Sequence, residues 1–164
     1  MTATERPVAD RPARVVFALL VVACFAAFFI TQRLKHTPTA VQLFKLTPSF
    51  APRSAGGLKE ERISFKLAQA DEVTVSIERA AGGEVASLLH DHPVARYKQF
   101  SLRWNGRLGA ARGYSVLRAP NGHTTLLPAN RGELAPAGEY RVRVSLRNQR
   151  RTVLSPRNFK LVGG

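Results

Sequence analysis

Cysteine and acidic residues are the scarce components of this sequence. One of the 164 residues is cysteine, Cys24, so no intramolecular disulfide can form and a folded domain must be held together by packing. Asp and Glu together number 11, and they are scattered along the chain. The sequence has no G-x-S-x-G motif and no glycine-rich phosphate loop before a helix. It therefore predicts a protein without catalytic activity and without a cofactor.

Positive charge is in large excess. Lys and Arg number 25, which gives a formal net charge of +14 at pH 7. Such a field attracts polyanions, namely lipid head groups, acidic polymers of the cell envelope or nucleic acid. The chain shows neither a recognition helix nor the aromatic signature of an RNA-recognition motif, which disfavours nucleic acid.

One long apolar run lies near the N-terminus. Residues 15–30 are 16 apolar residues without charge, Gly or Pro, and two polar uncharged residues extend the run. A helix of this length spans roughly 24 Å, and flanking cations can snorkel to the interface, which suits a membrane anchor. We expect a short cytoplasmic tail over residues 1–14, a transmembrane helix over 15–32 and a stalk over 33–40.

Three other interpretations of this run are weaker. A cleaved signal peptide would need an A-x-A site, for which Pro38-Thr39-Ala40 is a poor candidate. The segment V-V-A-C that ends at Cys24 resembles a lipoprotein signal, but the chain stays apolar after the cysteine. Whether Cys24 carries a lipid is left open. A buried helix of a soluble protein is the third alternative, and the flanking arginines and the missing polar face disfavour it.

The expected orientation in the membrane depends on the lengths of the segments that flank the apolar run. The cations are nearly balanced between the two flanks, so the positive-inside rule does not decide. A long domain can be exported regardless of its charge, whereas a short basic tail tends to stay inside. We expect a single-pass protein of the cell membrane with its C-terminal domain, residues 33–164, outside the cytoplasm.

Period-two alternation dominates the rest of the chain. Apolar and polar residues alternate in R-I-S-F-K-L (62–67), E-V-T-V-S-I-E-R (72–79), Q-F-S-L-R-W (99–104) and Y-R-V-R-V-S-L (140–146). Turn signals such as N-G and P-A-G separate these segments, and no helical pattern follows the apolar run. Residues 41–164 are therefore expected to form an all-β, Ig-like or fibronectin-type sandwich of about 7–9 strands.

The apolar positions of these strands supply the expected core. A final strand over residues 152–162 contains Pro156, which assigns it to a sheet edge or a bulge. The expected core residues are Phe65, Val75, Ile77, Phe100, Leu102, Trp104, Tyr140, Val142 and Val144.

The region from Ile63 to Val162 resembles a known family. It contains D-E-V-T-V-S-I-E-R-A-A-G-G-E-V-A-S-L-L, then F-S-L-R-W-N-G-R, then L-A-P-A-G-E-Y-R-V-R-V-S-L. This succession resembles the Ig-like domains at the C-terminus of the flagellar hook-capping protein FlgD and in many bacterial surface proteins. The resemblance implies a sandwich used as a spacer and binding platform. Residues 51–57 depart from the family pattern because they carry no carboxylate, which argues against calcium binding. The connection between Arg107 and Glu133 is longer than the family's, and we expect it to contain a β-hairpin closed by the turn dipeptide Asn121-Gly122.

A row of arginines is the candidate binding surface. Arg141, Arg143 and Arg147 alternate on the polar face of one expected strand, and Arg150 and Arg151 lie in the next turn. We expect this face to bind an anionic surface, either lipid head groups or an acidic envelope polymer. A solvated strand face without a partner is the alternative.

Histidines form the other tempting cluster. His90 and His92 share a face if the segment is a strand, but two ligands do not complete a metal site. A polar loop before Pro93 is the preferred interpretation, and no metal is expected.

These features together predict a membrane-anchored structural or interaction module of the cell envelope, which binds an anionic polymer, lipid head groups or another envelope protein. The alternative is a basic nucleic-acid-binding domain tethered to the inner face of the membrane.

Overall fold

The computed structural model describes residues 10–35, 39–56 and 58–163, and the chain divides into two compact units, Met1–Pro38 and Thr39–Gly164. The first unit contains one helix among its described residues, α1 (Asp10–Lys35). Within it, Ala13–Gln32 is long and apolar enough to cross a membrane, and none of this segment is buried. The helix extends beyond the expected 15–32 at both ends. Most of the expected tail, and residues 36–38 of the expected stalk, lie outside the described residues.

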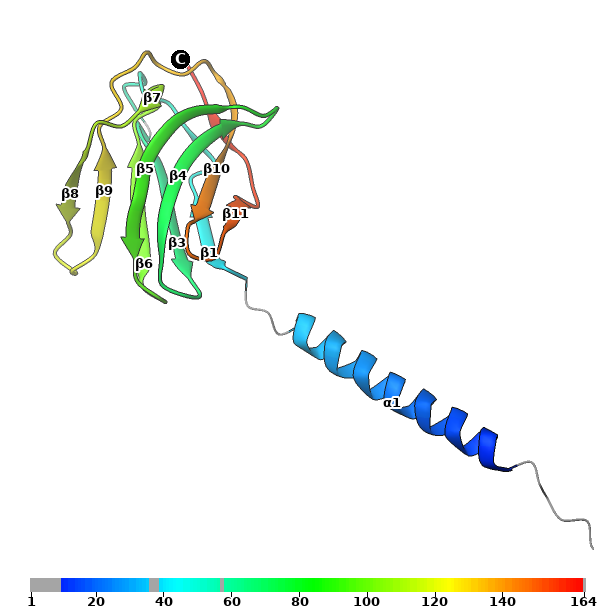
Figure 1. Ribbon diagram of the computed structural model, residues 1–164. Helices are drawn as coiled ribbons and strands as arrows, with labels where there is room; N and C mark the ends of the chain where they lie inside the picture. The colour runs from blue at the N-terminus through cyan, green and yellow to red at the C-terminus, as the bar shows by residue number, and fades with distance from the viewer. Residues whose placement is uncertain (1–9, 36–38, 57, 164) are drawn as a thin grey trace, which may run out of the picture. The chain divides into compact units, whose positions relative to one another are not determined.

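The second unit is a β-sandwich of two sheets (Figure 1). In spatial order, the strands of the first sheet are β1 (Val41–Leu46), β3 (Glu61–Leu67), β6 (Gln99–Trp104), β9 (Thr124–Pro128) and β8 (Tyr114–Arg118). The second sheet contains β2 (Ser49–Phe50), β12 (Phe159–Leu161), β10 (Gly138–Leu146), β4 (Asp71–Arg79), β5 (Glu84–Val94) and β7 (Gly109–Ala110), with β11 (Arg151–Leu154) paired to β10. The order β1-β3-β6 facing β12-β10-β4-β5 is that of a fibronectin-type sandwich, which confirms the expected fold class.

The structure has more strands than expected because several are very short. The described residues form twelve strands, of which β2 and β7 have two residues each. The expected last strand is divided into β11 and β12 by Pro156. Ser155 bridges this break, since the amide of Val142 donates to its Oγ at 3.1 Å and its own amide donates to the carbonyl of Val142.

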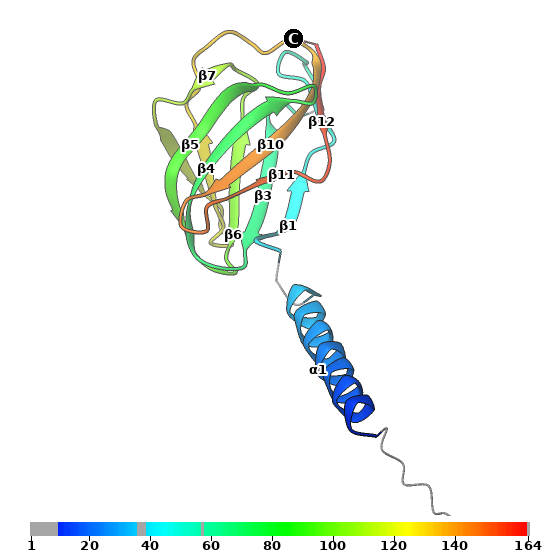
Figure 2. The ribbon, with the colours of Figure 1, turned by 45° about the vertical axis from the view of Figure 1, so that its right-hand side comes forward.

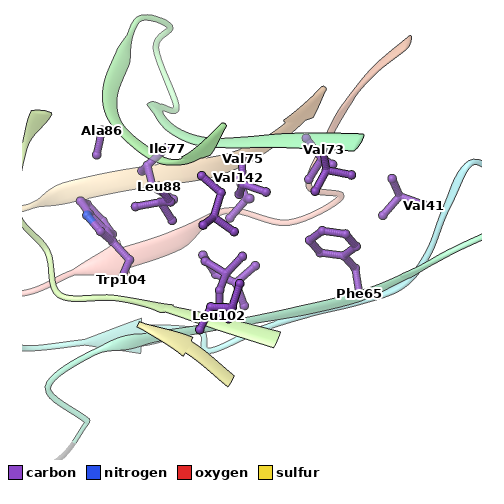
Figure 3. Close-up of a cluster of buried hydrophobic side chains, with 14 of the residues drawn as sticks. Val41, Phe65, Val73, Val75, Ile77, Ala86, Leu88, Leu102, Trp104 and Val142 are labelled. Carbon is purple, nitrogen blue, oxygen red and sulfur yellow. The ribbon is translucent and has the colours of Figure 1, made fainter. Parts of the chain in front are cut away.

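The core lies between the two sheets, where alternate side chains of facing strands meet (Figure 3). Of the nine expected core residues, all but Phe100 are buried. Phe100 is half-buried, because it lies near the start of β6, where its ring packs against Phe65 and His92 at the edge of the core. Every residue of the core cluster falls between Ala40 and Leu161, so the sandwich has a core of its own.

The P-x-G-x-Y and W-N-G segments form fixed turns at one end of the sandwich. The hydroxyl of Tyr140 donates to the carbonyl of Pro136, an arrangement known as a tyrosine corner in such sandwiches. The indole Nε1 of Trp104 donates to the carbonyl of Arg107 at 2.9 Å. Between them, Gly106 adopts a φ of 78°, and a Cβ there would lie 2.9 Å from Cγ of Pro52, so the turn requires glycine.

Candidate anion-binding surface

Two arginines of the predicted row along β10, Arg143 and Arg147, form ion pairs with carboxylates of neighbouring strands. Antiparallel pairing of β10 with β4 places Arg143 Nη1 2.8 Å from Oε1 of Glu78. Arg147 Nη1 lies 3.0 Å from Oε2 of Glu72 and 2.8 Å from Oδ2 of Asp91.

The first arginine of the row is engaged as well. The Nε of Arg141 donates to Oδ1 of Asn158 at 3.0 Å. Each ion pair of the row is partly solvated and adds little to stability, on the order of 0–1 kcal/mol. A phosphate or carboxylate ligand at this face would compete with carboxylates already in place. The structure therefore gives the row a mainly intramolecular role, while it leaves Arg150 and Arg151 outside these pairs.

Loops and turns that are distant in the sequence lie together at the end of the sandwich where β1 begins (Figures 1 and 2). We call it the proximal end, because it is the end that follows α1 along the chain. The β3–β4 turn lies at its centre, where the amide of Ala68 donates to the carbonyl of Ala40. On one side, the β5–β6 loop is attached by the bond from the amide of Tyr97 to the carbonyl of Leu67 at 2.9 Å. On the other side, the carboxylate of Asp71 accepts the amides of Asn148 and Gln149 in the β10–β11 turn.

Four cations and one tyrosine project from these two connections and from the first residue of β11. We call them the proximal cluster, and its members are Arg96, Tyr97, Lys98, Arg150 and Arg151. All five are exposed. Among the described residues, none of the four cations forms an ion pair with a carboxylate, in contrast to Arg143 and Arg147.

Arg96 orders the aromatic member of the proximal cluster. Its Nε donates to the carbonyl of Ala68 at 3.1 Å, and its Nη2 donates to the hydroxyl of Tyr97 at 2.9 Å. Its guanidinium carbon lies 4.4 Å from the centroid of the Tyr97 ring, within cation–π range. Tyr97 is 53% exposed, so the loop presents an amphipathic aromatic between two positive charges.

Backbone strain marks both connections of the proximal cluster. Tyr97 has a φ of 58° and Arg150 a φ of 49°, in the left-handed region that non-glycine residues seldom adopt. A residue held there costs of order 1 kcal/mol or more, and such positions concentrate at functional sites. The tertiary hydrogen bonds of these loops hold the conformation against that cost.

The opposite end of the sandwich has a cleft of mixed charge. Its volume is about 810 Å³, and its charged lining residues are Arg53, Lys59, Arg107, Glu60 and Glu133. Glu60 is paired with Arg103 at 3.2 Å, and Arg107 donates to the carbonyl of Gly132. Charges of both signs make this cleft less selective for anions than the proximal cluster.

The histidine segment is a strand rather than the expected loop. His90, Asp91 and His92 belong to β5, which continues to Val94 through register irregularities opposite β4. The ring of His92 packs against Phe100 at 5.5 Å, and burial lowers the pKa of its imidazole. Among the described residues, no group of three or more His, Cys, Asp or Glu side chains is placed to hold a metal ion.

Glu61 is a buried carboxyl that the sequence pattern had not singled out. It occupies the first inward position of β3, directly opposite Trp104 on β6. Its Oε1 accepts the amide of Thr47 at 2.8 Å, while Oε2 has no hydrogen-bond partner within the part of the chain that the structure describes. Burial raises the pKa of this carboxyl from 4.5 to about 8, so the group is mostly protonated at neutral pH.

Comparison with known proteins adds no family assignment. A scan against protein-family models finds no match, and a search of curated proteins finds none either. The resemblance to FlgD-type Ig-like domains therefore stays a prediction.

Sequence reasoning identified two members of the proximal cluster and missed three. Arg150 and Arg151 belonged to the predicted surface, whereas the signal for the other three was the short run R-Y-K between two strand patterns. An exposed aromatic between cations is typical of interfacial segments. The convergence of the two loops depends on the sheet order and has no local signal.

Proposed function

We propose that this protein is a single-pass, non-catalytic module of the cell envelope, with the β-sandwich outside the cytoplasmic membrane and α1 as the anchor. The proximal cluster of the sandwich binds the anionic head groups of the membrane lipids. The observation that carries the proposal is a set of four cations without a carboxylate partner among the described residues, together with an exposed tyrosine. They lie on neighbouring connections at the end of the domain where the chain arrives from the apolar helix.

Three features support the lipid surface over the other anionic partners. The proximal end is covalently tethered to α1. When α1 is bound in a membrane, this tether raises the effective concentration of lipid head groups near the proximal cluster. Tyrosine is enriched at membrane–water interfaces, and each Lys or Arg near an anionic surface contributes about 1 kcal/mol. The FlgD-type family is proposed as the structural relative, because members serve as spacers and binding platforms.

Vesicle sedimentation of a fragment covering residues 39–164 tests lipid binding. This fragment contains the whole core cluster, so it can be studied without the helix. Vesicles of phosphatidylcholine alone are compared with vesicles that contain 30% phosphatidylglycerol. Binding is expected only to the anionic vesicles, and it should weaken as salt is added.

Two double variants distinguish binding through the proximal cluster from binding through the overall net charge of the domain. Arg150→Ser with Arg151→Ser removes two cations of the cluster, and Arg141→Ser with Arg143→Ser removes two from the β10 row. The first variant should weaken binding by roughly 30-fold, since two contacts of about 1 kcal/mol each are lost. The second should have a small effect. Equal weakening by both would mean that overall charge, not this surface, is recognised, and tighter binding to single-stranded oligonucleotides than to vesicles would favour the nucleic-acid alternative.

A further inference from the structure

The outer edge of the β8–β9 hairpin is an open strand edge. β8 is the last strand of the first sheet, and β9 pairs with it on one side only (Figure 1). Tyr114 and Val116 are each 48% exposed and Leu117 is 44% exposed. A short strand with three exposed apolar side chains and a free edge is a template for further strand pairing.

The hydrogen bonds of the hairpin show which backbone groups face outward. The amide of Ala129 donates to the carbonyl of Gly113, and the amide of Ala119 donates to the carbonyl of His123. In an antiparallel pair, hydrogen-bonded positions alternate, so the intervening odd-numbered residues also face β9. The amides and carbonyls of Tyr114, Val116 and Arg118 therefore point away from the sheet, and within the described part of the chain no hydrogen bond reaches them.

Other edges of the sandwich carry features that discourage pairing. β1 contains a bulge between Gln42 and Lys45, where Leu43 has a φ of 50°. β11 begins with Arg151 and is followed closely by Pro156. Such bulges, charges and prolines are the usual means by which edge strands avoid association. β8 has neither a bulge nor a proline within it, and its one charge is at its end.

We propose that β8 pairs with β8 of a second copy of this chain, antiparallel and centred on Val116. All outward backbone groups are then matched, because Tyr114 lies opposite Arg118 of the second copy and Val116 lies opposite itself. The pairing makes about six backbone hydrogen bonds and joins the two first sheets across a two-fold axis.

Side-chain chemistry fixes the register. At the centred register, the guanidinium of Arg118 meets the ring of Tyr114, a favourable cation–π pair, and the two valines pack on the axis. A shift in one direction places Arg118 opposite Arg112, which is repulsive. A shift in the other direction places Tyr114 opposite Pro120, which has no amide to donate. The chain is thus self-complementary at one register only.

Disulfide trapping in the full-length protein tests this pairing. Cys24→Ala removes the natural thiol, and Val116→Cys places one thiol per copy on the proposed axis. Opposed residues of a hydrogen-bonded antiparallel pair have Cα atoms about 5.5 Å apart, within the range of about 4.4–6.8 Å that a disulfide requires. Mild oxidation in detergent micelles should therefore yield a covalent dimer.

Matched variants control for collision and for association through the helix. In the same background, Tyr114→Cys alone and Arg118→Cys alone place identical residues roughly 14 Å apart, so each should form at least tenfold less dimer. A mixture of the two should recover the cross-link between unlike copies. Val116→Lys, which sets like charges on the axis, should raise the dimer dissociation constant at least tenfold in sedimentation velocity. Equal trapping at all three positions, or a monomer at every concentration tested, would refute the proposal.

Discussion

The buried carboxyl of Glu61 allows a quantitative prediction about stability. Its pKa is about 8 in the folded domain, compared with 4.5 in the unfolded chain. The difference of about 3.5 pH units, at about 1.36 kcal/mol each, disfavours the ionised folded form by roughly 5 kcal/mol. A carboxyl whose pKa is raised by folding stabilises the fold fully below pH 4.5, and that contribution is lost as the pH rises toward 8. At pH 7 the loss amounts to roughly 3 kcal/mol.

Glu61→Gln removes this titration. The amide oxygen of glutamine can still accept the amide of Thr47, so the fold is retained. Urea unfolding of residues 39–164 can be followed by the fluorescence of Trp104, the one tryptophan of the chain. From pH 5 to pH 8, the stability of the natural protein should fall relative to that of the variant by several kcal/mol. Because burial lowers the pKa of His92, this histidine makes the stability fall as the pH is lowered. Both proteins contain His92, so its contribution cancels in the difference between their stabilities.

The reasoning about Glu61 is refuted if the two proteins show parallel pH profiles. A parallel result would mean that the carboxyl titrates near its ordinary value, and hence that water reaches Oε2 in the folded domain.

Further substitutions test the turns, the paired row and the proximal cluster. Tyr140→Phe removes the hydroxyl bond of the tyrosine corner and should cost about 1 kcal/mol in urea unfolding, with no change in vesicle binding. Gly106→Ala should cost at least 1–2 kcal/mol because of its positive φ and the close Pro52 ring, and a stability within about 0.3 kcal/mol of the natural protein would contradict the turn geometry. Glu78→Gln should cost less than about 1 kcal/mol, because Arg143 is partly solvated. Tyr97→Gly should leave stability unchanged or raise it by about 1 kcal/mol through relief of strain, yet weaken vesicle binding; retained binding would exclude the ring from the interface.

Local patterns predicted the elements of this fold better than they predicted its surface. Alternation identified β3, β4, β6 and β10, and N-G correctly predicted the β8–β9 hairpin, because both signals depend on neighbouring residues alone. The length of β5 was missed, since a proline near its end resembles a loop signal. The ion pairs of Arg143 and Arg147 were missed because their carboxylates come from β4 and β5, strands that are distant in sequence.

The burial of Glu61 illustrates a different limit. A glutamate before an apolar strand resembles an exposed strand end, and its burial follows from the register that sets it opposite Trp104. Similarly, the residues of the proximal cluster come from the β5–β6 loop and from the region of the β10–β11 turn. Both are hydrogen-bonded to residues that flank the β3–β4 turn, which lies between them. Such tertiary arrangements require the sheet order, which alternation does not encode.

The location of the sandwich is tested most directly by thiol labelling in intact cells. The full-length protein with Cys24→Ala carries Ala81→Cys in the exposed β4–β5 turn, and a membrane-impermeant maleimide is applied before and after lysis. Labelling in intact cells equal to that after lysis is the expected result for an anchored domain outside the cytoplasmic membrane. Labelling that appears only after lysis would place the domain inside and contradict the proposed function.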